Sequence, residues 1–217
     1  MKFLTGLLLA VFLAGVSAGG ALAANYSKGD LEKLSQSLDE VFVTLCSLGD
    51  LNVNEKPLDM VKGASLNDAE LLTFCIYYTY NYRPDAVKHV QNGKPFDLYE
   101  NGEPVDSYCL VPFKAAIATA KQVFGRDLQI PAAKKGKIGE YFVNGNDFVI
   151  GEGDAAYMPP LKAVSVQDGA DGLLNVVCEQ EDEEEEGKKL KFNAVVREIS
   201  DKGQKSWQIL AIKPAGR

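Results

Sequence analysis

The sequence has little of what most catalytic sites are built from. Among its 217 residues there is a single histidine, His89, and no two of its four cysteines are spaced as Cys-x-x-Cys. This argues against a His-rich zinc or copper site and against a thioredoxin-like redox motif. There is also no Gly-x-Ser-x-Gly motif, so the nucleophile elbow of an α/β-hydrolase is missing. We therefore expect neither a metal nor a cofactor.

Positive charge is also scarce, with 23 Lys and Arg against 30 Asp and Glu and a formal net charge of −7. A chain of this charge does not favour a nucleic-acid partner. The acidic run over residues 179–186 lacks the alternating Asp/Asn and Gly spacing of a calcium loop. Lysines follow it directly, at positions 188, 189 and 191, so opposite charges would face each other across a hairpin. The run therefore predicts a solvated hairpin tip.

Beyond the N-terminus, no apolar run is long enough to cross a membrane. Residues 1–23 combine one early lysine, an uncharged apolar stretch and the small-residue pattern Ala21-Leu22-Ala23. These are the three parts of a signal peptide, and they predict cleavage after Ala23; an uncleaved anchor is the alternative. We expect the mature chain to begin at Ala24, to have no membrane partner, and to be periplasmic or secreted in a bacterium.

The four cysteines Cys46, Cys75, Cys109 and Cys178 would then lie in an oxidising compartment, where disulfides persist. Four cysteines allow three pairings. We favour Cys46 with Cys109, since both are expected at helix ends, and leave Cys75 and Cys178 on apolar faces. All four are disulfide candidates with a structural role.

Hydrophobic periodicity predicts three helices in the first part of the mature chain, over residues 28–48, over residues 69–82 and from Pro112 to Gly125. Alternating patterns then predict a hairpin with the turn Asn144-Gly145 and four longer strands at residues 161–166, 173–179, 190–199 and 206–212. Consecutive strands with short turns form an antiparallel meander. The expected fold is α+β, with three N-terminal helices packed on a curved antiparallel sheet in a single domain over residues 24–217.

The last two predicted strands read Phe-Asn-Ala-Val-Val-Arg-Glu at 192–198 and Ser-Trp-Gln-Ile-Leu at 206–210. With the order of helices before them, they resemble the closing pair in exported members of the nuclear-transport-factor-two-like superfamily, where a late Trp precedes an Ile-Leu pair. A cystatin-like wrap of sheet around one helix is the nearest alternative. The superfamily resemblance implies a cone-shaped α+β fold but no single function, since its members include enzymes, ligand binders and interaction modules.

An aromatic stripe in the second helix supplies the candidate pocket residues Tyr77, Tyr78 and Tyr82, to which we add His89. Helical spacing of aromatic residues is also what core packing produces. The sequence favours an exported, non-catalytic binding or interaction protein with a small molecule or a protein as partner. One alternative is a cofactor-free isomerase- or dehydratase-like enzyme with a Tyr/Asp/His site in a cone cavity. Another is an exported inhibitor of the cystatin kind.

Overall fold

The computed structural model describes residues 26–48, 57–62, 66–91, 99–100, 103–104, 107–151, 158–183, 185–201 and 204–215. The predicted signal peptide and its cleavage site lie outside these residues. The helices are α1 (Lys28–Ser47), α2 (Asp68–Tyr82) and α3 (Phe113–Phe124), with short 3₁₀ turns at Pro84–Ala86 and Ala170–Gly172. The strands are β1 (Leu58–Asp59), β2 (Lys88–Gln91), β3 (Tyr99–Glu100), β4 (Glu103–Pro104), β5 (Ser107–Pro112), β6 (Lys137–Ile138), β7 (Tyr141–Asn144), β8 (Asp147–Gly151), β9 (Lys162–Asp168), β10 (Leu173–Glu181), β11 (Lys189–Asp201) and β12 (Gln204–Pro214).

All three helices form where the sequence predicts them. Helix α2 begins at a capping box, in which the Asn67 side chain accepts from the backbone N–H of Glu70 and the Glu70 side chain accepts from that of Asn67. It ends before Pro84, because the residue that precedes a proline is pushed out of the helical region. Helix α3 is closed by Gly125, whose φ of +69° is the left-handed conformation that glycine adopts most readily.

The described strands form two five-stranded antiparallel sheets and one two-stranded sheet, which confirms the α+β class. The first sheet has the order β1-β12-β11-β10-β9, so the predicted meander of four long strands is present as consecutive neighbours. The second has the order β2-β5-β8-β7-β6. The predicted Asn-Gly hairpin is β7–β8, and it belongs to this second sheet.

Strand β5 organises the second sheet and has no counterpart among the strands that the sequence predicts. It lies between β2 and β8, and its four middle residues Tyr108, Cys109, Leu110 and Val111 are all buried. Burial on both faces gives a strand a continuous apolar run in place of alternation. Such a run is difficult to distinguish from the start of a buried helix, and here helix α3 follows it directly.

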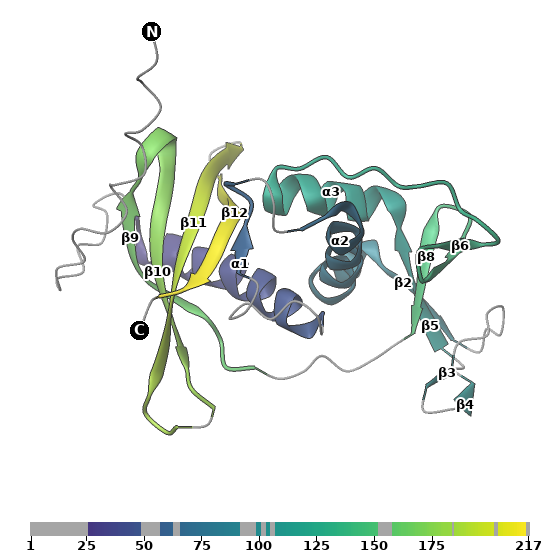
Figure 1. Cartoon of the computed structure of the whole chain (residues 1–217), viewed down its shortest axis with the longest axis horizontal. Helices are drawn as coiled ribbons and strands as arrows, with labels where there is room; N and C mark the ends of the chain where they lie inside the picture. Colours follow the sequence, from purple (N-terminus) through teal and green to yellow (C-terminus); the bar gives the residue numbers. More distant parts are fainter. Residues whose placement is uncertain are drawn as a thin grey trace, which may run out of the picture.

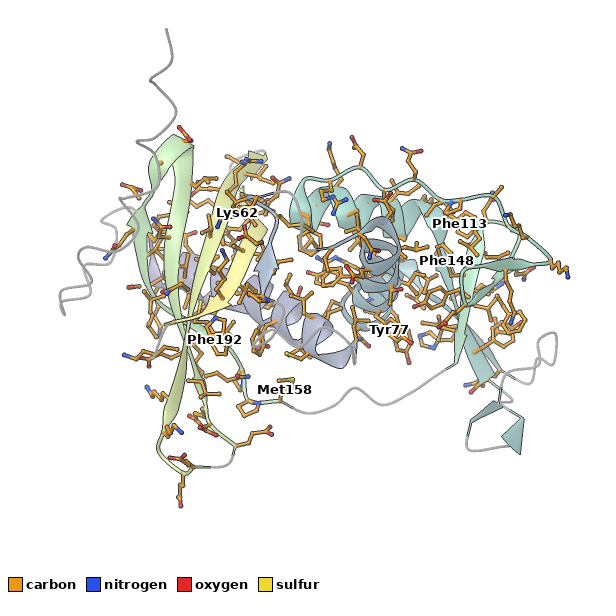
Figure 2. The ribbon with its side chains drawn as sticks, in the orientation of Figure 1. Lys62, Tyr77, Phe113, Phe148, Met158 and Phe192 are labelled. Atoms are coloured by element: carbon orange, nitrogen blue, oxygen red, sulfur yellow. The ribbon has the colours of Figure 1, made fainter. Side chains whose placement is uncertain are left out.

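The three helices lie between the two large sheets, as Figure 1 shows. Helix α1 packs on β9 and β12, α2 and α3 pack on each other, and both of them contact β5. One cluster of buried side chains continues through these layers, from Phe192 in the first sheet to Phe148 in the second; Figure 2 labels both, on opposite sides of the helices. The core therefore joins the two sheets through the helices.

The predicted pairing of cysteines is wrong. All four cysteines lie in the described part of the chain, and no disulfide joins any of them. Cys46 is in the last turn of α1, but Cys109 is in the middle of β5 and not at a helix end. Cys75 and Cys178 are fully buried, and burial raises the pKa of each thiol to about 12. These two side chains act as small apolar core residues.

Candidate functional site

A polar pocket lies where the three helices meet the last strand of the first sheet. Its volume of about 40 Å³ is space for about two or three water molecules. Pockets for whole small molecules are usually several times larger, roughly 300–1,000 Å³. The residues that line it are Ser37 and Val41 of α1, Tyr78 of α2, Arg83 directly after α2, Gln122 and Val123 of α3, and Ser206, Trp207 and Ile209 of β12.

The buried carboxylate of Glu40 lies next to Tyr78, one of the residues that line this pocket. Glu40 of α1 is only 9% exposed, and its Oε2 accepts a hydrogen bond of 2.6 Å from the Tyr78 hydroxyl of α2. Its other oxygen accepts from Gln36 Nε2 at 2.9 Å. Both oxygens of Glu40 are therefore engaged, as a buried carboxylate requires.

Arg83 completes the network at the end of α2. Its Nη1 lies 3.7 Å from Glu40 Oε2, and its Nη2 donates to the Tyr78 hydroxyl at 3.2 Å. Nη1 also donates to the carbonyl of Tyr82, one of the acceptors that a helix leaves open at its C-terminus. Its guanidinium also stacks over the Tyr78 ring, 5.0 Å from the centroid. Arg83 thus neutralises Glu40 and fixes the end of the helix.

The Tyr78 hydroxyl is held in its neutral form. Burial and the hydrogen bond to Glu40 raise the pKa of Tyr78 well above its ordinary value of 10, although the Arg83 guanidinium acts in the opposite direction. The Tyr82 ring packs against Tyr78 at 5.2 Å, and burial together with the charges of Asp39 and Glu40 raises the pKa of Tyr82 to about 12. At neutral pH both hydroxyls keep their protons, so neither is a ready base.

Trp207 lines the pocket from β12, and its side chain is only 5% exposed. Among the buried side-chain nitrogen and oxygen atoms of the described residues, its Nε1 is the one that has no hydrogen-bond partner. An indole N–H donates and cannot accept. Trp207 is therefore a pocket residue whose indole nitrogen is an unsatisfied donor, and this nitrogen has almost no accessible surface.

The four candidate residues from the sequence do not come together at one site. Tyr78 lines the pocket, and Tyr82 supports it from the next turn. Tyr77 lies on another face of α2 and is 38% exposed; Figure 2 labels it beside this helix. His89 is on β2 and is not a lining residue; its Nδ1 lies 3.2 Å from the sulfur of Cys109, its register partner on β5.

Sequence reasoning does not identify three residues at this site, namely the lining residues Arg83 and Trp207 and the buried Glu40 beside Tyr78. Glu40 is one of several acids between the apolar positions of α1, where charged residues are usually exposed. Its spacing of four from Gln36 is the available signal, because residues at that spacing share a helix face. For Arg83, the available signal is its position directly after a helix C-terminus, where a positive charge is favourable. Trp207 is the single tryptophan, but its sequence position does not show that its N–H lacks a partner.

The remaining charged features do not form a metal centre. No group of three or more His, Cys, Asp or Glu side chains within the described ranges could hold a metal ion. In the β10–β11 hairpin, Glu179 is 2.9 Å from Lys189 and Asp182 is 3.3 Å from Lys188, so the predicted neutralisation across the hairpin is present. A second depression of about 120 Å³ on the outer side of β9 and β10 is lined by the same Glu179 and Lys189.

Comparisons with protein-family models, with curated proteins and with solved structures find no match for this chain. None of the described helices has the length and apolar character of a membrane span. The case for function therefore depends on the pocket itself.

Proposed function

We propose that this chain is an exported, non-catalytic binding protein that recognises one small polar group in the pocket between α1, α2, α3 and β12. The observation that carries the proposal is a small space with polar side chains on its walls, among them Ser37, Arg83 and Gln122. The volume of about 40 Å³ suits a single functional group.

The way the polar side chains are engaged supports binding over catalysis. A Tyr/Asp/His enzyme needs its acid and base to face one reacting molecule. Here the Tyr78 hydroxyl donates to Glu40 and accepts from Arg83, and His89 lies elsewhere, on β2, with its Nδ1 3.2 Å from the Cys109 sulfur. The signal-like residues 1–23 support export, and the meander β9–β12 after the helices supports the proposed likeness to the nuclear-transport-factor-two-like superfamily.

The test of binding uses the single tryptophan as its own reporter. A ¹H–¹⁵N spectrum of the full chain should contain one indole N–H peak, because Trp207 is the only tryptophan. We expect a set of small polar compounds to contain some that shift this peak saturably and are recovered unchanged. Consumption of a bound compound, abolished by Tyr78→Phe, would instead make the chain an enzyme.

The test of export is separate. The full sequence, expressed in a bacterium and collected from the periplasm or the medium, should have Ala24 as its N-terminal residue. A protein that stays in the cytoplasm with Met1 intact would contradict the export part of the proposal and leave the binding part unaffected.

A further inference from the structure

We propose that helix α1 closes the outer edge of β9 and so prevents a second copy of this chain from adding a strand to the first sheet. Strand β9 is the last in the order of that sheet, with β10 as its hydrogen-bonded neighbour. An edge strand offers backbone N–H and C=O groups to any other extended chain, and a second copy of the protein has the same edge to offer in return. The contact between α1 and β9 is separate from the pocket, so this proposal goes beyond the proposed function and does not depend on it.

Two side chains of α1 accept the hydrogen bonds that a neighbouring strand would otherwise accept. Asp39 Oδ1 accepts from the backbone N–H of Leu161 at 2.8 Å, and Ser35 Oγ accepts from the backbone N–H of Ala163 at 3.0 Å. Because these two N–H groups donate to α1 and not to β10, they point out of the open side of the strand. Both of these edge donors are therefore already satisfied within the chain.

The spacing of the two acceptors on α1 matches the spacing of the two donors on β9. Four residues of an α-helix rise about 6 Å, and two residues of a strand rise about 6.6 Å. Neither Ser35 nor Asp39 is of a residue type that favours a helix interior. Burial raises the pKa of Asp39 above its ordinary value, and the hydrogen bond from Leu161 acts in the opposite direction. A partly buried carboxylate is costly without such a bond, so the contact with β9 accounts for an acid at this position.

The chain on either side of these contacts is also poorly suited to pairing with another strand. Pro159 and Pro160 come directly before Leu161, and a proline has no backbone N–H to donate. The carbonyl of Pro159 already accepts from Gln180 Nε2 at 2.7 Å. Val164 is an extra residue on the β9 side of the pairing with β10, and such a bulge increases the local twist of a strand. Prolines, bulges and a covering helix are the means by which sheet edges are protected from association, and β9 has all three.

The experiment measures the mass of the full chain in solution against its concentration, by analytical ultracentrifugation. The test variant is Ser35→Ala/Asp39→Ala, and the matched control is Ser47→Ala/Asp127→Ala. Ser47 and Asp127 are exposed, and their hydrogen bonds go to a carbonyl within α1 and to a lysine of α3. We expect the mass of the test variant to rise with concentration toward twice that of the monomer, while wild type and control do not change. A test variant that behaves as wild type does would overturn the proposal.

Two further measurements separate a closed edge from a general loss of stability. The variant Ser35→Thr/Asp39→Asn keeps an oxygen acceptor at each position, and we expect it to remain a monomer. Amide hydrogen exchange of the test variant should be at least about tenfold faster at Leu161 and Ala163 when dilute, and slower again along β9 when the copies pair. Protection gained only in other strands would overturn the proposal.

A variant that fails to fold does not end the test. If Ser35→Ala/Asp39→Ala is unfolded, Ser35→Ala alone is measured, because it removes one acceptor and leaves the charge of Asp39 in place. We expect faster exchange at Ala163 and a mass that rises with concentration, to a smaller extent than for the double variant. An unchanged mass for this single variant would overturn the proposal.

Discussion

The residue that closes α3 is expected to be unusually sensitive to substitution. Gly125 has φ +69°, and a Cβ built on it would lie 2.7 Å from Gln208 Nε2 and 2.8 Å from Gln208 Oε1. The Gln208 side chain is buried, donates to the Lys121 carbonyl at 3.1 Å and accepts from Arg197 at 3.3 Å. An added methyl group at Gly125 must therefore displace a side chain that fastens the end of α3 to β12.

The expected cost of Gly125→Ala has two parts. Holding an alanine in the left-handed region costs about 1–2 kcal/mol. Moving Gln208 gives up its hydrogen bond to the Lys121 carbonyl, which contributes about 1 kcal/mol more. Gly145→Ala is the matched control, because Gly145 has φ +62° and nothing within 4 Å of its added Cβ. The strain is common to both variants, so their difference of about 1 kcal/mol measures the displaced Gln208 alone.

The measurement is urea unfolding followed by far-ultraviolet circular dichroism, with the free energy of unfolding extrapolated to water. The double variant Gly125→Ala/Gln208→Ala should lose less than the sum of the two single variants, since the clash is removed once. Equal losses for Gly125→Ala and Gly145→Ala would refute the reasoning, because they would show that Gln208 yields without cost.

Three further predictions follow from the buried groups. The thiols of Cys75 and Cys178, with pKa values of about 12 and full burial, should not react with a thiol reagent at pH 8 until urea unfolds the chain; rapid labelling in the native state would contradict the packing. The pKa of Tyr82 is raised from 10 to about 12, so the neutral Tyr82 should contribute its full stabilisation below pH 10 and lose it between pH 10 and 12. Tyrosinate absorbance and urea-unfolding midpoints measured against pH test this. Unchanged stability up to pH 12 would contradict the prediction. Tyr78→Phe leaves Glu40 without its 2.6 Å donor and should lower the free energy of unfolding by about 1–3 kcal/mol, whereas a loss near zero would mean that water replaces the hydroxyl.

Local signals in the sequence suffice for the helices and for the meander. Asn67 and Glu70 form the capping box that their spacing indicates, and Gly125 ends α3 in the left-handed conformation. These features are decided within a few residues of chain, where side-chain hydrogen bonds and φ preferences act directly. The alternation along β10 and β11 likewise arises because each strand has one face toward the helices.

The second sheet depends on pairing between distant segments, and local patterns do not contain that information. Strand β5 is a short apolar run, and it becomes a central strand because β8 pairs with it, with Cys109 opposite Ile150. The prediction for the cysteines failed for the same reason. Export and the number of cysteines suggest disulfides, and Cys109 was expected at a helix end. It lies instead in β5, a strand that forms through this long-range pairing, and no disulfide is present among the four cysteines.

The candidate site was only partly predictable for a related reason. The stripe on α2 identifies Tyr78 as a possible wall, but the partners that define the chemistry come from elsewhere: Glu40 from α1, Arg83 from beyond the helix end and Trp207 from the last strand. Each belongs to a different packing contact between a helix and its neighbour. A group bound in the pocket would therefore contact all three helices and β12, so its binding and the docking of the helices on the first sheet should stabilise each other.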